Sequence, residues 1–212
     1  MLLRKKTIKV FDWNSENFEK DTLFSAKDSV RYYKGLLRSG LMSMDPHTGE
    51  IKAWVGGPNF KHFKYDMVKK GRRQVGSTFK PFVYATALES GVVDPCYQVP
   101  DIESCIEVPF NEFRKKLWCP TNSGNNFSGA LTSISFALAN SMNNITASII
   151  KKGSMINDVF NRVAQLGIDT SKFKQVPAMA LGVFDISVHD IVGVIAPFAN
   201  QGVYIKPVYL LK

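Results

Sequence analysis

The alternation of hydrophobic and polar residues is clearest around residues 41–55. Two short apolar stretches, 41–44 and 50–55, flank the turn sequence Asp-Pro-His-Thr-Gly at 45–49. In the second stretch, aliphatic residues alternate with Lys52 and Trp54. Because side chains on a strand point alternately to opposite faces, this pattern predicts a half-buried β-hairpin.

Apolar repeats of helical spacing occupy much of the remaining chain. They predict helices over residues 25–38, 131–139, 145–150, 154–166 and 187–200. Ser187 with Asp190 predicts the cap of the last helix. Residues 4–24 have no strong period and predict an irregular lead-in, residues 92–129 are rich in proline and predict loops, and residues 203–211 predict an extended segment.

One further helix carries candidate chemistry at its start. Pro81 lacks an N–H group and fits only the first turn of a helix, so the apolar run that ends at Gly91 begins near Ser77. Lys80 lies three residues after Ser77, on the same face. A helix N-terminus favours negative charge, and a desolvated lysine accepts a proton more readily. The pair can therefore form an activated nucleophile.

The spacing of Ser77 and Lys80 is not specific by itself. The pairs Ser148/Lys151 and 171/174 share it. Of the three pairs, only the first has a glycine before the serine and a proline after the lysine. The flanking residues therefore favour Ser77, and the alternative is an N-cap serine followed by a surface lysine.

A second polar constellation interrupts the apolar helices at residues 140–144. Ser141 and Asn143 are two residues apart in this break, so their side chains point roughly the same way. A hydroxyl beside Ser77 can relay protons, and an amide can hold a substrate carbonyl or N–H group. Serine and asparagine at a helix junction are also common capping residues, which is the alternative interpretation.

The net charge of +9 comes from the N-terminal part of the chain. Residues 1–80 carry 17 basic and 8 acidic side chains, whereas the remaining residues are balanced. The basic segment 61–73 fits either a solvated loop or a surface that attracts anionic ligands. No helix-turn-helix, zinc-finger or RNA-binding signature is present, so the sequence does not predict nucleic-acid binding.

No motif in the sequence predicts a metal site, a cofactor or a membrane span. Cys96, Cys105 and Cys119 lack close metal-ligand spacing and leave both their pairing and the redox compartment open. The three histidines form no His/Glu metal motif. The N-terminus is not a signal peptide, and the longest apolar run, 191–199, is nine residues long and contains Pro197.

Taken together, these motifs resemble the transpeptidase domain of class A penicillin-binding proteins, the bifunctional cell-wall synthases. The resemblance rests on the two constellations, which match the serine–lysine and serine–asparagine motifs of this group and its β-lactamase relatives. It extends over residues 26–212 in the family's order and spacing. The supporting segments are the hairpin 44–57, the nucleophile segment 73–82, the Trp118/Pro120/Asn122 stretch, the helix 131–143, Leu181–Gly182 and 198–203.

The resemblance implies a role for each candidate residue. Ser77 corresponds to the acylated nucleophile, Lys80 to the group that takes its proton, Ser141 to a proton relay and Asn143 to the group that binds the substrate amide. The implied partners are peptidoglycan stem peptides ending in D-Ala-D-Ala, and β-lactams, which acylate the same serine. No cofactor is implied. The resemblance also implies a location at the extracytoplasmic, periplasmic face of the inner membrane, and that this chain is part of a longer protein anchored in that membrane.

One family motif does not occur in this sequence. No Lys-Thr-Gly or Lys-Ser-Gly is present, and the chain has 69 residues after Asn143. We therefore expect an interdomain lead-in or linker over residues 1–25 and the N-terminal part of a transpeptidase domain over 26–212. The expected fold is α+β, with an incomplete antiparallel sheet packed against helices. Such a fragment is expected to self-associate and to react slowly with penicillin.

Two other functions remain as alternatives. A β-lactamase would need a base that activates a deacylating water, and no residue marks such a group. A non-catalytic interaction domain would keep the fold without the chemistry, and the intact Ser77, Lys80, Ser141 and Asn143 argue against it.

Overall fold

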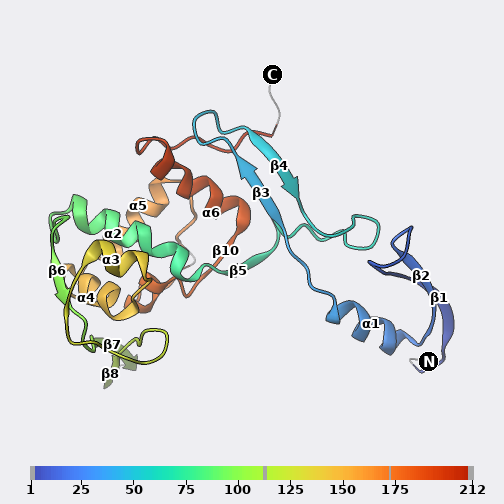
Figure 1. Ribbon diagram of the computed structural model, residues 1–212, viewed down its shortest axis with the longest axis horizontal. Helices are drawn as coiled ribbons and strands as arrows, with labels where there is room; N and C mark the ends of the chain where they lie inside the picture. Colours follow the sequence, from blue (N-terminus) through green and yellow to red (C-terminus); the bar gives the residue numbers. More distant parts are fainter. Residues whose placement is uncertain (1–2, 112–113, 172, 210–212) are drawn as a thin grey trace.

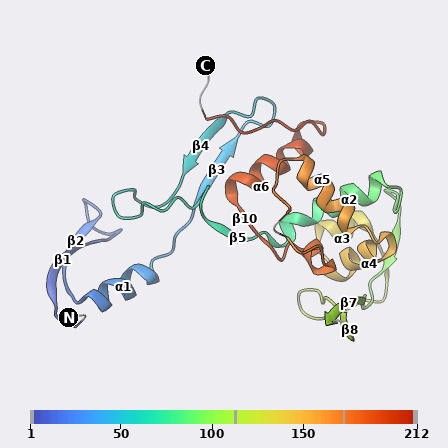
Figure 2. The ribbon, with the colours of Figure 1, turned by 180° about the vertical axis from the view of Figure 1, so that it is seen from behind.

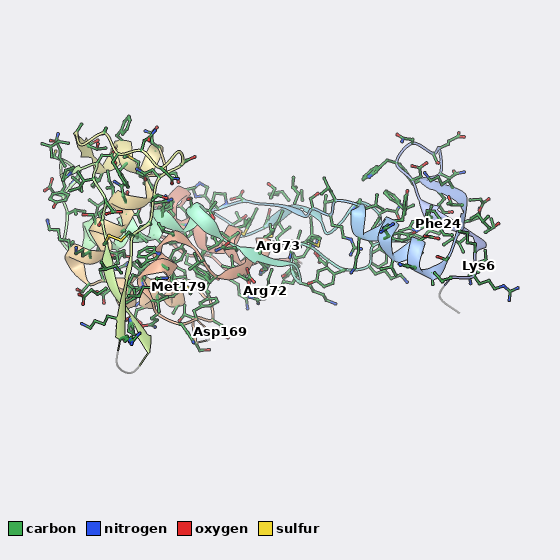
Figure 3. All side chains as sticks on the ribbon, turned by 90° about the horizontal axis from the view of Figure 1, so that it is seen from below. Lys6, Phe24, Arg72, Arg73, Asp169 and Met179 are labelled. Carbon is green, nitrogen blue, oxygen red and sulfur yellow. A yellow bond between two sulfur atoms is a disulfide. The ribbon has the colours of Figure 1, made fainter. Side chains whose placement is uncertain are left out.

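The computed structural model describes residues 3–111, 114–171 and 173–209. The molecule is elongated, with a hairpin and one helix at the N-terminal end and a helical lobe at the other (Figure 1). The same arrangement is seen from behind in Figure 2. In Figure 3, Lys6 and Phe24 mark the N-terminal end, Arg72 and Arg73 the narrow middle, and Met179 the helical lobe.

Helix α1 (Ala26–Gly35) lies at the N-terminal end of the molecule. The α-helices of the helical lobe are α2 (Lys80–Glu89), α3 (Ile134–Ala139), α4 (Asn143–Gly153), α5 (Ile156–Gln165) and α6 (Val188–Ile195). The 3₁₀ helices are η1 (Gly76–Phe79), η2 (Pro177–Leu181) and η3 (Ala196–Ala199). The predicted cap of the last helix is confirmed, because the Ser187 hydroxyl accepts a hydrogen bond from the Asp190 N–H group at 3.1 Å.

The strands described by the structure form antiparallel pairs. They are β1 (Lys6–Phe11) with β2 (Glu19–Phe24), β3 (Leu41–Met44) with β4 (Ile51–Val55), β5 (Arg72–Gln74) with β10 (Asp185–Ser187), β6 (Gln98–Pro100) with β9 (Leu131–Ser133), and β7 (Ile106–Asn111) with β8 (Arg114–Trp118). The pair β3–β4 confirms the predicted hairpin. Together with the helices, these strands make an α+β fold.

Aromatic side chains hold the helical lobe together. Phe79, at the end of η1, is 1% exposed and its ring centroid lies 4.8 Å from that of Phe184 and 5.7 Å from that of Phe160. Phe82 follows one turn later and is equally buried. Burying aromatic rings of this size dominates core energetics, so the start of α2 is fixed by the centre of the core.

The N-terminal segment is more regular than its sequence pattern suggests. Residues 4–24 were expected to be irregular, but β1 and β2 pair there over six residues each. Charged residues such as Lys9 and Asp21 obscure the alternation of hydrophobic and polar residues along these strands. Phe18, just before β2, has a left-handed backbone with φ 56°. Helix α1 is shorter than the predicted range 25–38 and buries none of its residues. Leu37, which lies within that range, is 95% exposed.

Two further expectations are corrected in the helical lobe. The segment 92–129, expected to be loops, contains β6 and the hairpin β7–β8. The predicted helix 131–139 begins with the short strand β9 and becomes helical only at Ile134. Beyond residue 202, the described residues form one isolated bridge, between Val208 and Glu50. Residues 210 and 211 of the predicted extended segment lie outside the described residues.

Candidate active site

Ser77 lies in a tight turn that is held by backbone contacts from a distant segment. Gly76 has φ 59°, and its N–H group donates to the Gly182 carbonyl at 2.9 Å. The Val75 N–H group donates to the Phe184 carbonyl at 3.0 Å. Ser77 itself is exposed, and no hydrogen bond of its hydroxyl is recorded among the described residues. The turn therefore presents a serine at the surface on a fixed backbone.

The close approach of the two segments requires a glycine at position 182. A Cβ atom added there would lie 2.1 Å from the Gly76 carbonyl oxygen, and Gly182 has φ 71°. Both the steric contact and the left-handed backbone exclude larger residues without rearrangement. Gly182 was singled out in the sequence only as part of a matching segment, and no local pattern indicates this contact.

Lys80 starts α2 and is buried, with 1% of its surface exposed. Its backbone N–H group donates to the Ser77 carbonyl, which places the two residues on adjoining turns. The prediction that a helix begins near Ser77 is thus confirmed, with the difference that the first turn is 3₁₀. Burial lowers the pKa of Lys80 to about 8, because removal from water penalises the ammonium form.

The Lys80 ammonium donates to three oxygen atoms from one helix junction. The Nζ atom lies 3.0 Å from Ser141 Oγ, 2.5 Å from the Ser141 carbonyl oxygen and 2.6 Å from Asn143 Oδ1. These three acceptors match the three N–H groups of an ammonium. A buried charge is thus fully hydrogen-bonded, which offsets part of the cost of its desolvation.

Ser141 adopts a backbone conformation that is unusual for its residue type. Its φ is 54°, in the left-handed region, between the end of α3 and the start of α4. This conformation costs on the order of 1–2 kcal/mol for a residue other than glycine. It accompanies a geometry in which the carbonyl and the hydroxyl of the same residue both bind Lys80.

The structure brings three of the four predicted site residues into one hydrogen-bonded cluster. Ser141 and Asn143 both accept hydrogen bonds from the Lys80 ammonium, and Ser77 is joined to Lys80 through the chain and the Lys80 N–H group. The other two serine–lysine pairs form no such cluster in the described structure. Lys151 and Lys174 are exposed, and the Ser171 hydroxyl donates to Asp169.

The cysteines, whose pairing the sequence left open, form one disulfide. Cys105 is bonded to Cys119, and Cys96 is an exposed free thiol. Glu103 lies close enough to both sulfurs to resemble a set of metal ligands. Since a disulfide offers no thiolate, this group does not have the donor set of a zinc site.

The fold places the molecule among penicillin-binding transpeptidase domains. Penicillin-Binding Protein 1A from Haemophilus influenzae superposes with a TM-score of 0.73 at 29% identity, covering 81% of this chain and 25% of that structure. A transpeptidase domain from Burkholderia pseudomallei penicillin-binding protein 3 superposes with a TM-score of 0.61 at 15% identity, covering 83% of this chain and 54% of the other.

Sequence comparison assigns the family. The family described as penicillin binding protein transpeptidase domain matches residues 40–212, and the penicillin-binding protein middle domain matches residues 1–37. The chain therefore belongs to the penicillin-binding protein transpeptidase family, and its relatives are proteins of the PBP1A type.

Two curated relatives illustrate the extent of the match. Penicillin-binding protein 1A of Pseudomonas aeruginosa is 29% identical over 171 residues, covering 80% of this chain and 20% of the relative. Penicillin-binding protein 1A of Rickettsia prowazekii is 32% identical over 172 residues, covering 81% of this chain and 21% of the relative. The chain thus spans about a fifth of the length of these relatives. Within the described residues, no helix is both long and apolar enough to cross a membrane.

Proposed function

We propose that this chain carries the nucleophile of a serine DD-transpeptidase that crosslinks peptidoglycan stem peptides. The observation that carries the proposal is the buried Lys80, whose ammonium group is held by Ser141 and Asn143 one turn away from an exposed serine on a rigid turn. The similarity to penicillin-binding proteins 1A supports the penicillin-binding part of the proposal.

In the proposed reaction, Lys80 in its amine form takes the proton of the Ser77 hydroxyl. The Ser77 Oγ atom attacks the carbonyl carbon of the penultimate D-Ala, and the peptide bond to the terminal D-Ala breaks. Lys80 passes this proton through Ser141 to the leaving amine and returns to its amine form. An amine from a neighbouring stem then attacks the ester, which forms the crosslink, and the proton that this amine loses is returned to Ser77.

We assign to Asn143 the binding of the substrate amide. Its amide oxygen contacts Lys80, so the position of this side chain is linked to that of the general base. A penicillin enters the same scheme, since attack of Ser77 opens the four-membered lactam ring and leaves a stable ester. We place this chemistry at the extracytoplasmic face of the membrane, where peptidoglycan is assembled.

Covalent labelling with a fluorescent penicillin tests the proposal. Ser77→Ala abolishes labelling, and Lys80→Ala slows it by about 10²–10⁴-fold, the usual contribution of a general base. The controls Ser148→Ala and Ser171→Ala label like the unaltered chain. Labelling that persists in Ser77→Ala would overturn the assignment of the nucleophile.

The reaction time in this experiment must allow for a slow rate. The sequence contains no Lys-Thr-Gly motif, which in the family supplies a cation and an oxyanion-hole donor, and one such donor is worth about 2.7–4 kcal/mol in other acyl-transfer enzymes. A form lengthened to include this motif is therefore labelled in parallel. Lack of labelling in both forms would contradict the proposed function, and rapid release of the label would favour a β-lactamase.

A further inference from the structure

A buried carboxylate lies behind the candidate active site. Asp101 follows β6 and is 5% exposed. One of its oxygens accepts hydrogen bonds at 2.8 Å from both the N–H group and the hydroxyl of Ser128. The other accepts from the side-chain amides of Asn144 at 2.8 Å and Asn122 at 3.3 Å. A carboxylate that satisfies four donors is a fixed anchor.

Asn122 connects this anchor to the start of α4. Its amide nitrogen donates to Asp101, while its amide oxygen accepts from the backbone N–H groups of Asn143, at 2.8 Å, and Asn144, at 3.4 Å. Met142, at the N-cap position of α4, has no side chain that could accept these bonds. Asn122 therefore supplies, from 20 residues earlier in the chain, the cap that the helix itself lacks.

The neighbouring residue, Thr121, orients the side chain of Asn143. The Thr121 carbonyl oxygen lies 2.8 Å from Asn143 Nδ2, and a carbonyl only accepts hydrogen bonds. The amide nitrogen must therefore face Thr121, which directs the amide oxygen towards Lys80 at 2.6 Å. Residues 121 and 122 together hold both the backbone and the side chain of Asn143.

We propose that Asp101 and Asn122 are positioning residues for the reaction: Asp101 fixes Asn122, and Asn122 fixes the start of α4 so that Asn143 and Ser141 meet Lys80. This inference rests on the proposed function of Lys80 and Asn143. Among the described hydrogen bonds, none joins Asp101 or Asn122 to Lys80 or Ser77. Their effect passes through the amides at the start of α4.

The charge of Asp101 suits this role. Burial raises its pKa, but the hydrogen bonds from Ser128, Asn144 and Asn122 outweigh burial, so that the pKa lies below its ordinary value. The carboxylate is therefore ionised at neutral pH. An ionised acceptor holds neutral amide donors more strongly than a neutral group does.

The pKa of Lys80, measured from the pH dependence of its Cε resonance by NMR, tests the proposal independently of labelling. In Asn122→Ala, the amides at the start of α4 lose their acceptor and Asn143 Oδ1 moves away from the ammonium. Because the ammonium then loses a hydrogen-bond acceptor, the pKa of Lys80 falls by at least about half a unit. The controls Asn126→Ala and Asp94→Asn, at exposed sites, leave it unchanged.

Loss of the donor at residue 122 distinguishes positioning from general stability. Asn122→Asp keeps an acceptor for the amides of α4 but places a second carboxylate against Asp101, and it lowers the plateau rate of penicillin labelling about tenfold or more, as misplacement of a catalytic group does. All variants are compared at a temperature where they are folded.

The outcomes separate this inference from the proposed function. If Asn122→Ala melts earlier but leaves the Lys80 pKa and the labelling rate of the folded protein unchanged, Asn122 is only structural and the inference is wrong. If Lys80 responds to Asn122→Ala while Ser77→Ala still labels, the positioning of Lys80 stands and the assignment of the nucleophile fails. An undiminished labelling rate in folded Asn122→Asp would also contradict the inference.

Discussion

Lys80 combines two properties that oppose each other. Burial favours the neutral amine, whereas the three oxygen atoms around Nζ favour the ammonium. Burial has the larger effect, and the pKa falls to about 8. At pH 7 about a tenth of the molecules then hold the amine form that can accept the Ser77 proton, far more than for a lysine in water.

The first prediction concerns pH. The rate of penicillin labelling rises about tenfold per pH unit below pH 8 and becomes level above it, because only the amine form of Lys80 accepts a proton. Folding stability also rises with pH between about 8 and 10.5, since the unfolded lysine binds a proton that the folded one has released. Stopped labelling reactions and thermal melts across this range measure both effects.

Lys80→Arg is the control for the pH prediction. A guanidinium stays protonated at every accessible pH, so the variant should label slowly and without a rise near pH 8. A rise that persists in this variant would show that another group titrates.

The second prediction concerns the contact between Gly182 and Gly76. In Gly182→Ala the added Cβ atom would meet the Gly76 carbonyl at 2.1 Å, so η1 must shift and labelling of Ser77 should fall by at least about tenfold. The matched control is Gly91→Ala. Gly91 has φ 69° but nothing within 4 Å of its added Cβ atom, so this variant loses only about 1–2 kcal/mol of backbone stability.

Urea unfolding and labelling rates of the two glycine variants are measured together. If both variants lose the same stability and both label normally, the contact does not position Ser77.

At the residue scale, the sequence predicted the identity of the clustered side chains better than their geometry. Pro81 restricted the helix start, and the polar break placed Ser141 and Asn143 at a junction. The left-handed backbone of Ser141 and the role of Asn122 could not be predicted, because both depend on contacts with segments remote in sequence.

At the scale of elements, the hairpin β7–β8 is closed at its base by the disulfide Cys105–Cys119. The segment that contains this hairpin begins after Asp101 and ends just before Asn122. The disulfide therefore joins the two ends of this segment, next to the residues that contact the start of α4.

The third prediction concerns this disulfide. The two cysteines are 14 residues apart, and a crosslink that closes a loop of this size stabilises a protein by about 3 kcal/mol. The double variant Cys105→Ser/Cys119→Ser should lose about that much free energy of unfolding in urea. Cys96→Ser, which removes an exposed thiol, should change it by less than about 0.5 kcal/mol. Equal effects of the two changes would show that the disulfide does not stabilise the fold.

Among the elements, the hairpin at 41–55 and the cap at Ser187 were predicted, whereas the hairpins β1–β2 and β7–β8 and the strands paired with remote segments were not. The cap at Ser187 and the turn at 45–49 are contained within a few residues of sequence. By contrast, β5 pairs with β10 and β6 with β9, each over three residues. Strands this short have no readable period, and their pairing depends on the tertiary fold.

At the scale of the whole molecule, Phe63 links the N-terminal hairpin to the rest of the chain. It follows β4 in the sequence, is 5% exposed, and its ring lies 5.1 Å from that of Phe11 and 5.9 Å from that of Tyr33. Arg38 also lies over this ring. Phe63 thus packs into the core of the N-terminal lobe, which consists of β1, β2 and α1. In sequence it belongs to the segment 40–212 that matches the transpeptidase family.

The fourth prediction follows from this position. Phe63→Ala should cost the N-terminal lobe about 3–5 kcal/mol of packing energy and speed hydrogen exchange in β1, β2 and α1. Exchange in α4, which lies in the helical lobe, should not change. Phe60→Ala, at a position 79% exposed, is the control and should leave both regions unchanged. Faster exchange in α4 as well would mean that the two lobes unfold together.

The central claim is that Ser77 is the nucleophile and that Lys80 accepts its proton. Mapping the site of a penicillin adduct by mass spectrometry tests this claim most directly. The chain contains its own comparison, because Ser148 and Ser171 have a lysine at the same spacing but lack a buried partner cluster. After incubation with benzylpenicillin and digestion, we predict a ring-opened adduct on the peptide that contains Ser77, strongly reduced in Lys80→Arg. An adduct on another serine, or an undiminished adduct on Ser77 in Lys80→Arg, would contradict the account.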